Sequence, residues 1–168
     1  AGFECTYATA LGLGARYDDA LPVAEAVVDL AKRFRLDFAL PYALCASAIA
    51  HAGHRRWAEA HADIEEALHE ARAGRHAYAE HICLAEMIRL FAQQGNHSAA
   101  LVLDIPTSGH SLPAGIAEAL ASRALVLASA SRLTEASGLA EEVRGSSQAI
   151  EPTVLIAAVD AIVAVKSG

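Results

Sequence analysis

The residue types most able to do chemistry are histidines, and they gather in one part of the chain. Six of the eight lie between positions 51 and 81. Among them, His61, Glu65 and His69 follow one another at four-residue steps, which places them on one face of a helix at a spacing that neighbouring metal ligands use. Three ligands spread over two turns lie too far apart for one ion, and no cysteine joins them. The sequence therefore predicts surface histidines, no metal site and no other cofactor.

Candidate nucleophiles give no better case for an enzyme. The three cysteines, Cys5, Cys45 and Cys83, are about forty residues apart and form no C-x-x-C motif, so we expect free thiols in a reducing cytoplasm. Cys45 falls at a core position, and no His-Cys-Asp order or nucleophile elbow accompanies it. The stretches Thr107–Ser111 and Gly145–Gln148 have the glycine and serine of phosphate loops, but they fall where helix connections are expected. We predict a non-enzymatic protein.

The composition indicates which type of secondary structure positions these residues. The chain has 168 residues, 40 of them alanine, with 5% aromatic residues and a formal net charge of -7. An alanine excess with few aromatic residues favours close-packed helices. The acidic balance, with few and scattered basic residues, argues against a nucleic-acid footprint within these residues. The longest apolar run, Val154–Val165, has about a dozen residues and contains Asp160, which predicts a buried terminal helix and no membrane span.

A repeat organises the chain. Four similar segments each carry an alanine at the start of a helix, and these marker alanines are separated by 40, 40 and 36 residues. The spacing predicts a repeating helical hairpin of about forty residues. The marker alanines are Ala20, Ala60, Ala100 and Ala136. Small residues precede them at the expected turns, namely Ala15, Gly53, Gly95 and Ser131.

The periodicity of apolar residues and the positions of the prolines predict the approximate bounds of the helices. From Trp57 onward, apolar residues recur at three- and four-residue steps and leave Glu59, Asp63, Glu66 and Glu70 on the polar side, which predicts an amphipathic helix. Prolines near expected helix starts agree with these bounds; they are Pro22, Pro41, Pro113 and Pro152. The expected helices run to about residue 15, then over 18–35, 40–52, 57–73, 75–95, 98–105, 112–130, 134–144 and 149–166.

Within the second and third segments the pattern resembles the tetratricopeptide repeat (TPR). Its spacing is matched by Leu84, Met87, Ile88, Phe91, Gly95 and Ala100. The forms ARYDDAL, RRWAEAHADIEEAL and SRLTEASGLAEEV are similar to the helical-repeat region of MalT-like bacterial transcriptional regulators of the LuxR family. The resemblance implies an all-α, right-handed superhelical stack (α-solenoid) of about four hairpins, forming one domain over residues 1–168.

The same resemblance implies a cytoplasmic sensing or coupling segment of a longer protein. In that family, DNA binding belongs to a separate C-terminal domain, and this segment binds no nucleic acid itself. The chain starts without methionine, in what reads as the middle of a helix, which agrees with a piece of a longer protein. Its partner is expected to be a peptide, a protein domain or a small-molecule effector bound in the concave groove.

The family's groove positions carry over to eight residues of this sequence: Cys5, Thr9, Ser47, His51, Arg89, Gln93, Leu125 and Ser129. We select Thr9, Ser47, His51, Arg89, Gln93 and Ser129 as ligand-binding candidates. Arg89 and Gln93 are one turn apart, and an arginine there is suited to hold a carboxylate or phosphate through two hydrogen bonds. Two alternatives remain open. Arg89 simply reaches solvent, or the domain is a self-assembly scaffold that forms a homodimer through the apolar residues 152–165.

Overall fold

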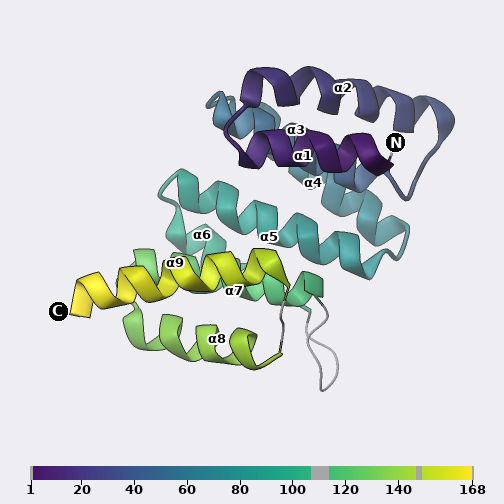
Figure 1. Cartoon of the computed structure of the whole chain (residues 1–168). Coiled ribbons are helices and arrows are strands. Elements are labelled where there is room, and N and C mark those ends of the chain that lie inside the picture. The colour runs from purple at the N-terminus through teal and green to yellow at the C-terminus, as the bar shows by residue number, and fades with distance from the viewer. Residues whose placement is uncertain (1, 107–113, 147–148, 168) are drawn as a thin grey trace. The chain divides into compact units, whose positions relative to one another are not determined.

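A computed structural model describes residues 2–106, 114–146 and 149–167 (Figure 1). In this part of the chain the secondary structure is helical without any strand, as predicted. The helices are α1 (Gly2–Leu13), α2 (Tyr17–Phe34), α3 (Leu40–Gly53), α4 (Trp57–Ala73), α5 (Ala77–Gln93), α6 (His97–Val102), α7 (Ala114–Ser129), α8 (Leu133–Ser146) and α9 (Ile150–Ser167). The predictions for Pro113, for a helix start at 112 and for residues 107–111 and 147–148 lie outside the described residues.

The chain divides into two compact units, Ala1–Glu86 and Met87–Gly168, and the division falls within α5. In the first unit, α3 packs against α1, α2 and α4. In the second, α7 packs against α6, α8 and α9. None of the helices in the described ranges is long and apolar enough to cross a membrane.

Three layers of buried residues join α1, α2 and α3 in the core of the first unit. One layer joins Cys5, Val27 and Ala43, the next Ala8, Ala24 and Ala46, and the third Leu11, Ala20 and Ala50. The residue numbers rise along α1 and α3 and fall along α2, so α1 and α3 are parallel and α2 runs opposite to both. The middle layer is alanine alone, and its three side chains are fully buried. Methyl groups let the helices approach closely, which explains the alanine content.

Helices end with a recurring backbone turn. A residue with positive φ follows the helix, and the next N–H donates to a carbonyl five residues earlier, as from Arg56 to His51 at 2.9 Å. The positive-φ residues in the described ranges are Ala15, Arg35, Arg55, Arg75, Gly95 and Ser131. The first five are spaced by 20 residues, half the predicted hairpin repeat. The predicted turn residues Ala15, Gly95 and Ser131 are thus confirmed.

The prediction of Gly53 as the turn residue is wrong, because Arg55 has the left-handed conformation at this turn and Gly53 is the last residue of α3. Gly53 is needed for a different reason. A Cβ atom at this position would lie 2.2 Å from the ring of Tyr17. The small residue therefore makes room for an aromatic side chain of α2. Pro22 also differs from expectation, since it lies inside α2, beyond its first turn.

The four marker alanines are fully buried, each four residues after the residue that precedes its helix. Their N–H groups donate to the carbonyls of those preceding residues, at 2.9–3.2 Å. Side chains at these helix starts help: Asn96 Oδ1 accepts from the Ala99 N–H at 3.2 Å, while Arg132 pairs with Glu135 at 2.6 Å. The repeated sequence element is therefore a helix start whose alanine enters the core.

Candidate binding site

Two of the predicted site residues, Ser47 and His51, lie one turn apart on α3 in the first unit. Both are buried, with 3% and 8% of their surface exposed. They meet the carboxylate of Asp63 on α4: the Ser47 hydroxyl donates to it, and His51 Nε2 lies 3.6 Å from Asp63 Oδ2. We call Ser47, His51 and Asp63 the polar trio. It interrupts a core that is otherwise largely alanine, leucine and isoleucine.

The electrostatics of the trio are those of a carboxylate kept from water. Burial raises the pKa of Asp63, and the hydrogen bond from Ser47 and the nearby His51 oppose that rise. Glu66 also raises the Asp63 pKa, while Lys32 of α2 lowers it. Lys32 and Glu66 form an ion pair at 2.7 Å at the more exposed edge of the trio.

Hydrogen bonding within the trio is incomplete. His51 Nδ1 and Asp63 Oδ2 are both buried without a hydrogen-bond partner. Leaving such an atom unsatisfied costs about 1–3 kcal/mol. The trio thus combines one hydrogen bond, from the Ser47 hydroxyl to the Asp63 carboxylate, with two buried atoms that could accept further hydrogen bonds.

The remaining candidate of the first unit, Thr9, lies partly exposed on α1 and is not part of the trio. In the second unit, Arg89 on α5 forms an ion pair and a hydrogen bond with side chains of the same unit. Its guanidinium lies 2.8 Å from Glu118 Oε1 and 3.0 Å from the Ser122 hydroxyl, both on α7. The carboxylate expected from a ligand is thus present as a side chain.

The other two candidates of the second unit are exposed at helix ends. Gln93 ends α5, and Ser129 ends α7 with its hydroxyl donating to the Leu125 carbonyl at 2.8 Å. The Ser129 carbonyl accepts from Lys166 Nζ at 2.9 Å. Ser129 is therefore part of the capping of α7 by α9.

Sequence reasoning missed Asp63, Glu118 and Ser122. Asp63 was assigned to the polar side of its helix, yet it turns toward α3 with 22% of its side chain exposed. The available signal was its place three residues after Ala60 and beside Ile64, which are both fully buried. Asp63 thus lies on the border of the apolar stripe, where the neighbouring helix decides its environment.

The histidines first considered for metal binding lie on α4, where Glu65 and His69 are exposed and His61 is partly exposed. Across residues 2–106, 114–146 and 149–167, no group of three or more His, Cys, Asp or Glu side chains is arranged to hold a metal ion.

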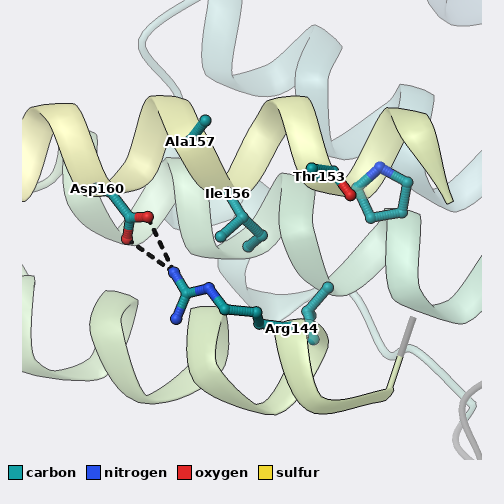
Figure 2. Close-up of a pocket in the computed structure, with 7 residues that line it drawn as sticks. Arg144, Thr153, Ile156, Ala157 and Asp160 are labelled. Carbon is teal, nitrogen blue, oxygen red and sulfur yellow. Dashed lines mark hydrogen bonds and ion pairs between the residues drawn. The ribbon is translucent and has the colours of Figure 1, made fainter. Parts of the chain in front are cut away.

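A hollow of about 240 Å³ between α8 and α9 was not predicted from the sequence (Figure 2). Arg144 reaches from α8 to Asp160 of α9 with two hydrogen bonds, at 2.9 and 3.1 Å. The other lining residues are mostly apolar: Val143, Pro152, Thr153, Ile156 and Ala157. At this volume the hollow is smaller than most small-molecule sites.

No protein-family model matches the chain, and no curated protein or solved structure has significant similarity to it. The comparisons therefore do not link it to TPR proteins or to LuxR-family regulators. Both resemblances remain predictions.

Proposed function

We propose that the chain is a non-enzymatic helical-repeat module that binds an effector or a protein segment through the polar trio of its first unit. The observation that carries this proposal is the pair of buried, unsatisfied atoms, His51 Nδ1 and Asp63 Oδ2. Buried polar atoms are nearly always hydrogen-bonded, and exceptions require an explanation. A bound group that supplies the missing hydrogen bonds is such an explanation.

The trio selects ligands that donate hydrogen bonds. When His51 carries its proton on Nε2, toward Asp63, its Nδ1 becomes an acceptor, and Asp63 Oδ2 is also an acceptor. Each of these atoms can accept a hydrogen bond from an ammonium, amide N–H or hydroxyl group. The net charge of -7 also favours a cationic or neutral ligand over an anionic one.

Binding at the trio provides a way to transmit a signal. Both unsatisfied atoms are closed off from solvent, so a ligand must displace side chains between α3 and α4 as it enters. A ligand that binds the displaced arrangement better shifts the population toward it. In a MalT-like regulator of the LuxR family, such a shift would control a separate DNA-binding domain.

A thermal-shift screen of the wild-type protein against amines, polyols and short basic peptides tests the proposal. A ligand at 100 times its Kd adds about 2.7 kcal/mol of stability. We expect the shift of a binding compound to disappear in His51→Ala and to persist in His69→Ala, since His69 is exposed on α4. Hits that survive His51→Ala and Asp63→Asn would refute binding at the trio.

A second candidate function, self-assembly, is favoured by the terminal helices. Large apolar side chains are exposed on α1 and α9, including Phe3 at 80% and Val165 at 83%. Uncovered apolar surface of this kind marks interaction sites. We expect light scattering to show association that increases with protein concentration and weakens in Phe3→Ser and Val165→Ser. A monomer at high concentration would reject this function.

A further inference from the structure

Two of the three cysteines face each other inside the first unit. The Sγ atoms of Cys45 on α3 and Cys83 on α5 are 3.4 Å apart, although the residues are 38 positions apart in sequence. Both side chains are buried, at 4% and 1% exposure. Cys5 lies elsewhere, with its thiol 3.9 Å from the Ala39 carbonyl. All three thiols are reduced in this structure.

We propose that Cys45 and Cys83 are a modification site, which a hydroperoxide converts to a reversible disulfide that joins α3 to α5. A disulfide needs an S–S distance of about 2.05 Å, so the sulfur atoms must approach by roughly 1.3 Å. Rotation of the two side chains and small helix adjustments supply movements of this size. The contact is between parts of one compact unit.

The oxidation balances with one peroxide molecule. A thiolate of the pair attacks the peroxide oxygen, breaks the O–O bond and becomes a sulfenic acid, while hydroxide leaves. The second cysteine then attacks the sulfenic sulfur, forms the S–S bond and releases the oxygen as water after protonation. In total, two thiols and hydrogen peroxide give one disulfide and two water molecules. Thiol reductants reverse the reaction through a mixed disulfide.

The surroundings select a small oxidant. Tyr42 lies near both thiols, and its ring centroid is 6.4 Å from that of Tyr78. Hydrogen peroxide has two heavy atoms and can reach such a buried pair during local opening, whereas a bulky disulfide oxidant requires larger exposure. The same burial slows the reduction of the product by thiol reductants without preventing it.

The disulfide would restrain the helix that carries the polar trio. Cys45 precedes Ser47 by two residues on α3. A covalent bond from Cys45 to α5 limits the movement of α3 that opening of the trio requires. Disulfide formation itself does not depend on the proposed binding function.

Thiol mapping of the folded protein tests the proposal. The protein is treated with hydrogen peroxide, free thiols are blocked with an alkylating reagent, and peptides are identified by mass spectrometry without reduction. We expect free thiols to fall from three to one, with a linked peptide containing Cys45 and Cys83. Melting temperature should rise by about 5–15 °C and return to the starting value with dithiothreitol.

Cys5 provides the matched control. Cys5→Ala should retain the linked peptide, whereas Cys45→Ala and Cys83→Ala should lose it. A second measurement does not depend on these variants folding: wild-type protein refolded in a glutathione redox buffer should form the 45–83 pair in large excess, while random pairing gives each of three pairs about a third. The proposal is overturned if folded protein keeps all thiols, if they oxidise only to sulfinic acids, or if pairing involves Cys5.

Discussion

At the scale of single residues, the polar trio combines a carboxylate with a site that disfavours its charge. Removing Asp63 from water costs free energy, which the Ser47 hydroxyl and His51 offset in part. The unsatisfied atoms His51 Nδ1 and Asp63 Oδ2 add to that cost. The polar trio is therefore less favourable for folding than apolar side chains would be at the same positions. Functional sites commonly break the rules of core packing in this way.

Asp63→Asn tests this electrostatic cost through pH. Because the pKa of Asp63 is raised, the folded state binds more protons than the unfolded state between about pH 3.8 and the folded-state pKa. This carboxyl therefore lowers the free energy of unfolding as pH rises through that window, and the loss is complete above it. Urea unfolding should show Asp63→Asn gaining stability relative to wild type across the window and keeping the gain at pH 7.

Asp37→Asn, which changes an exposed carboxylate of the same unit, should follow the wild-type curve more closely than Asp63→Asn does. If the free energy of unfolding of Asp63→Asn runs parallel to that of wild type from pH 4 to 7, the burial of this charge has no cost.

Gly53→Ala tests the close contact with Tyr17. The added Cβ would lie 2.2 Å from the ring, so the ring or α3 must move, at a cost of about 1–3 kcal/mol. Gly138→Ala is the matched control, since its Cβ meets nothing within 4 Å inside α8. It should stabilise by about 0.5–1 kcal/mol. Chemical denaturation of both variants decides the matter, and equal effects would contradict the packing argument.

Ser47 and His51 were predicted as residues that line a groove; both are buried beside Asp63, which was not predicted. Helical periodicity fixes the direction of a side chain on its own helix, and Ser47 and His51 follow that rule. The environments of Asp63 and Glu118 depend on which neighbouring helix faces them. The apolar periodicity of a single segment does not contain that information. The same reason explains why Arg89 was assigned to an outside ligand.

At the scale of helices, the boundaries were largely predictable because the turns carry strong local signals. Predicted and observed ends differ by a few residues in most helices. The turn conformation was less predictable, because three of the left-handed positions are held by arginine: Arg35, Arg55 and Arg75. Surrounding hydrogen bonds enforce a conformation that these side chains do not prefer.

Substitutions at left-handed positions should therefore have opposite signs. Gly95→Ala places a side chain at φ 73° and should destabilise by about 1 kcal/mol. Arg75→Gly relieves a residue at φ 54° and should stabilise by about 0.5–1 kcal/mol. Thermal and urea unfolding measure both. Two changes of the same sign would show that the side chain and not the backbone determines the effect.

The end of α7 is held by a single ammonium group. Lys166 Nζ donates to the Ala128 and Ser129 carbonyls at 3.1 and 2.9 Å, and it lies 3.0 Å from the Ser131 hydroxyl. Lys166→Met removes these bonds and the favourable charge at a helix C-terminus, so we expect a loss of about 1 kcal/mol. Lys166→Arg should lose less. Hydrogen exchange should locate the loosened amides at the ends of α7 and α9, and unchanged exchange there would contradict the capping role.

At the scale of the whole molecule, the net charge opposes the association proposed for the exposed terminal helices. The net charge of -7 at pH 7 falls toward zero near the sequence pI of about 5.6. Repulsion between copies then weakens, so light scattering at fixed concentration should show increasing mass from pH 7.5 to 6. Phe3→Ser should reduce that increase. A mass that stays constant over this range would exclude charge as the control of association.

The division into two units within α5 was not predictable from the sequence. The repeat pattern predicts equivalent hairpins and therefore no boundary between units. The division into compact units depends on how side chains far apart in sequence pack together. The all-α class and the position of the marker alanines at helix starts followed from composition and period, because both are properties of each segment alone.

The fully buried marker alanines also determine how the gene can vary. At Ala20, Ala60, Ala100 and Ala136 only glycine or serine approaches the size of the native side chain, while most neighbouring exposed positions accept many residue types. A complete library of single substitutions, sorted by yield of folded protein, should therefore show narrow tolerance at these four positions. The repeat would then appear as regularly spaced positions that tolerate few substitutions, even where the residues between the alanines have diverged.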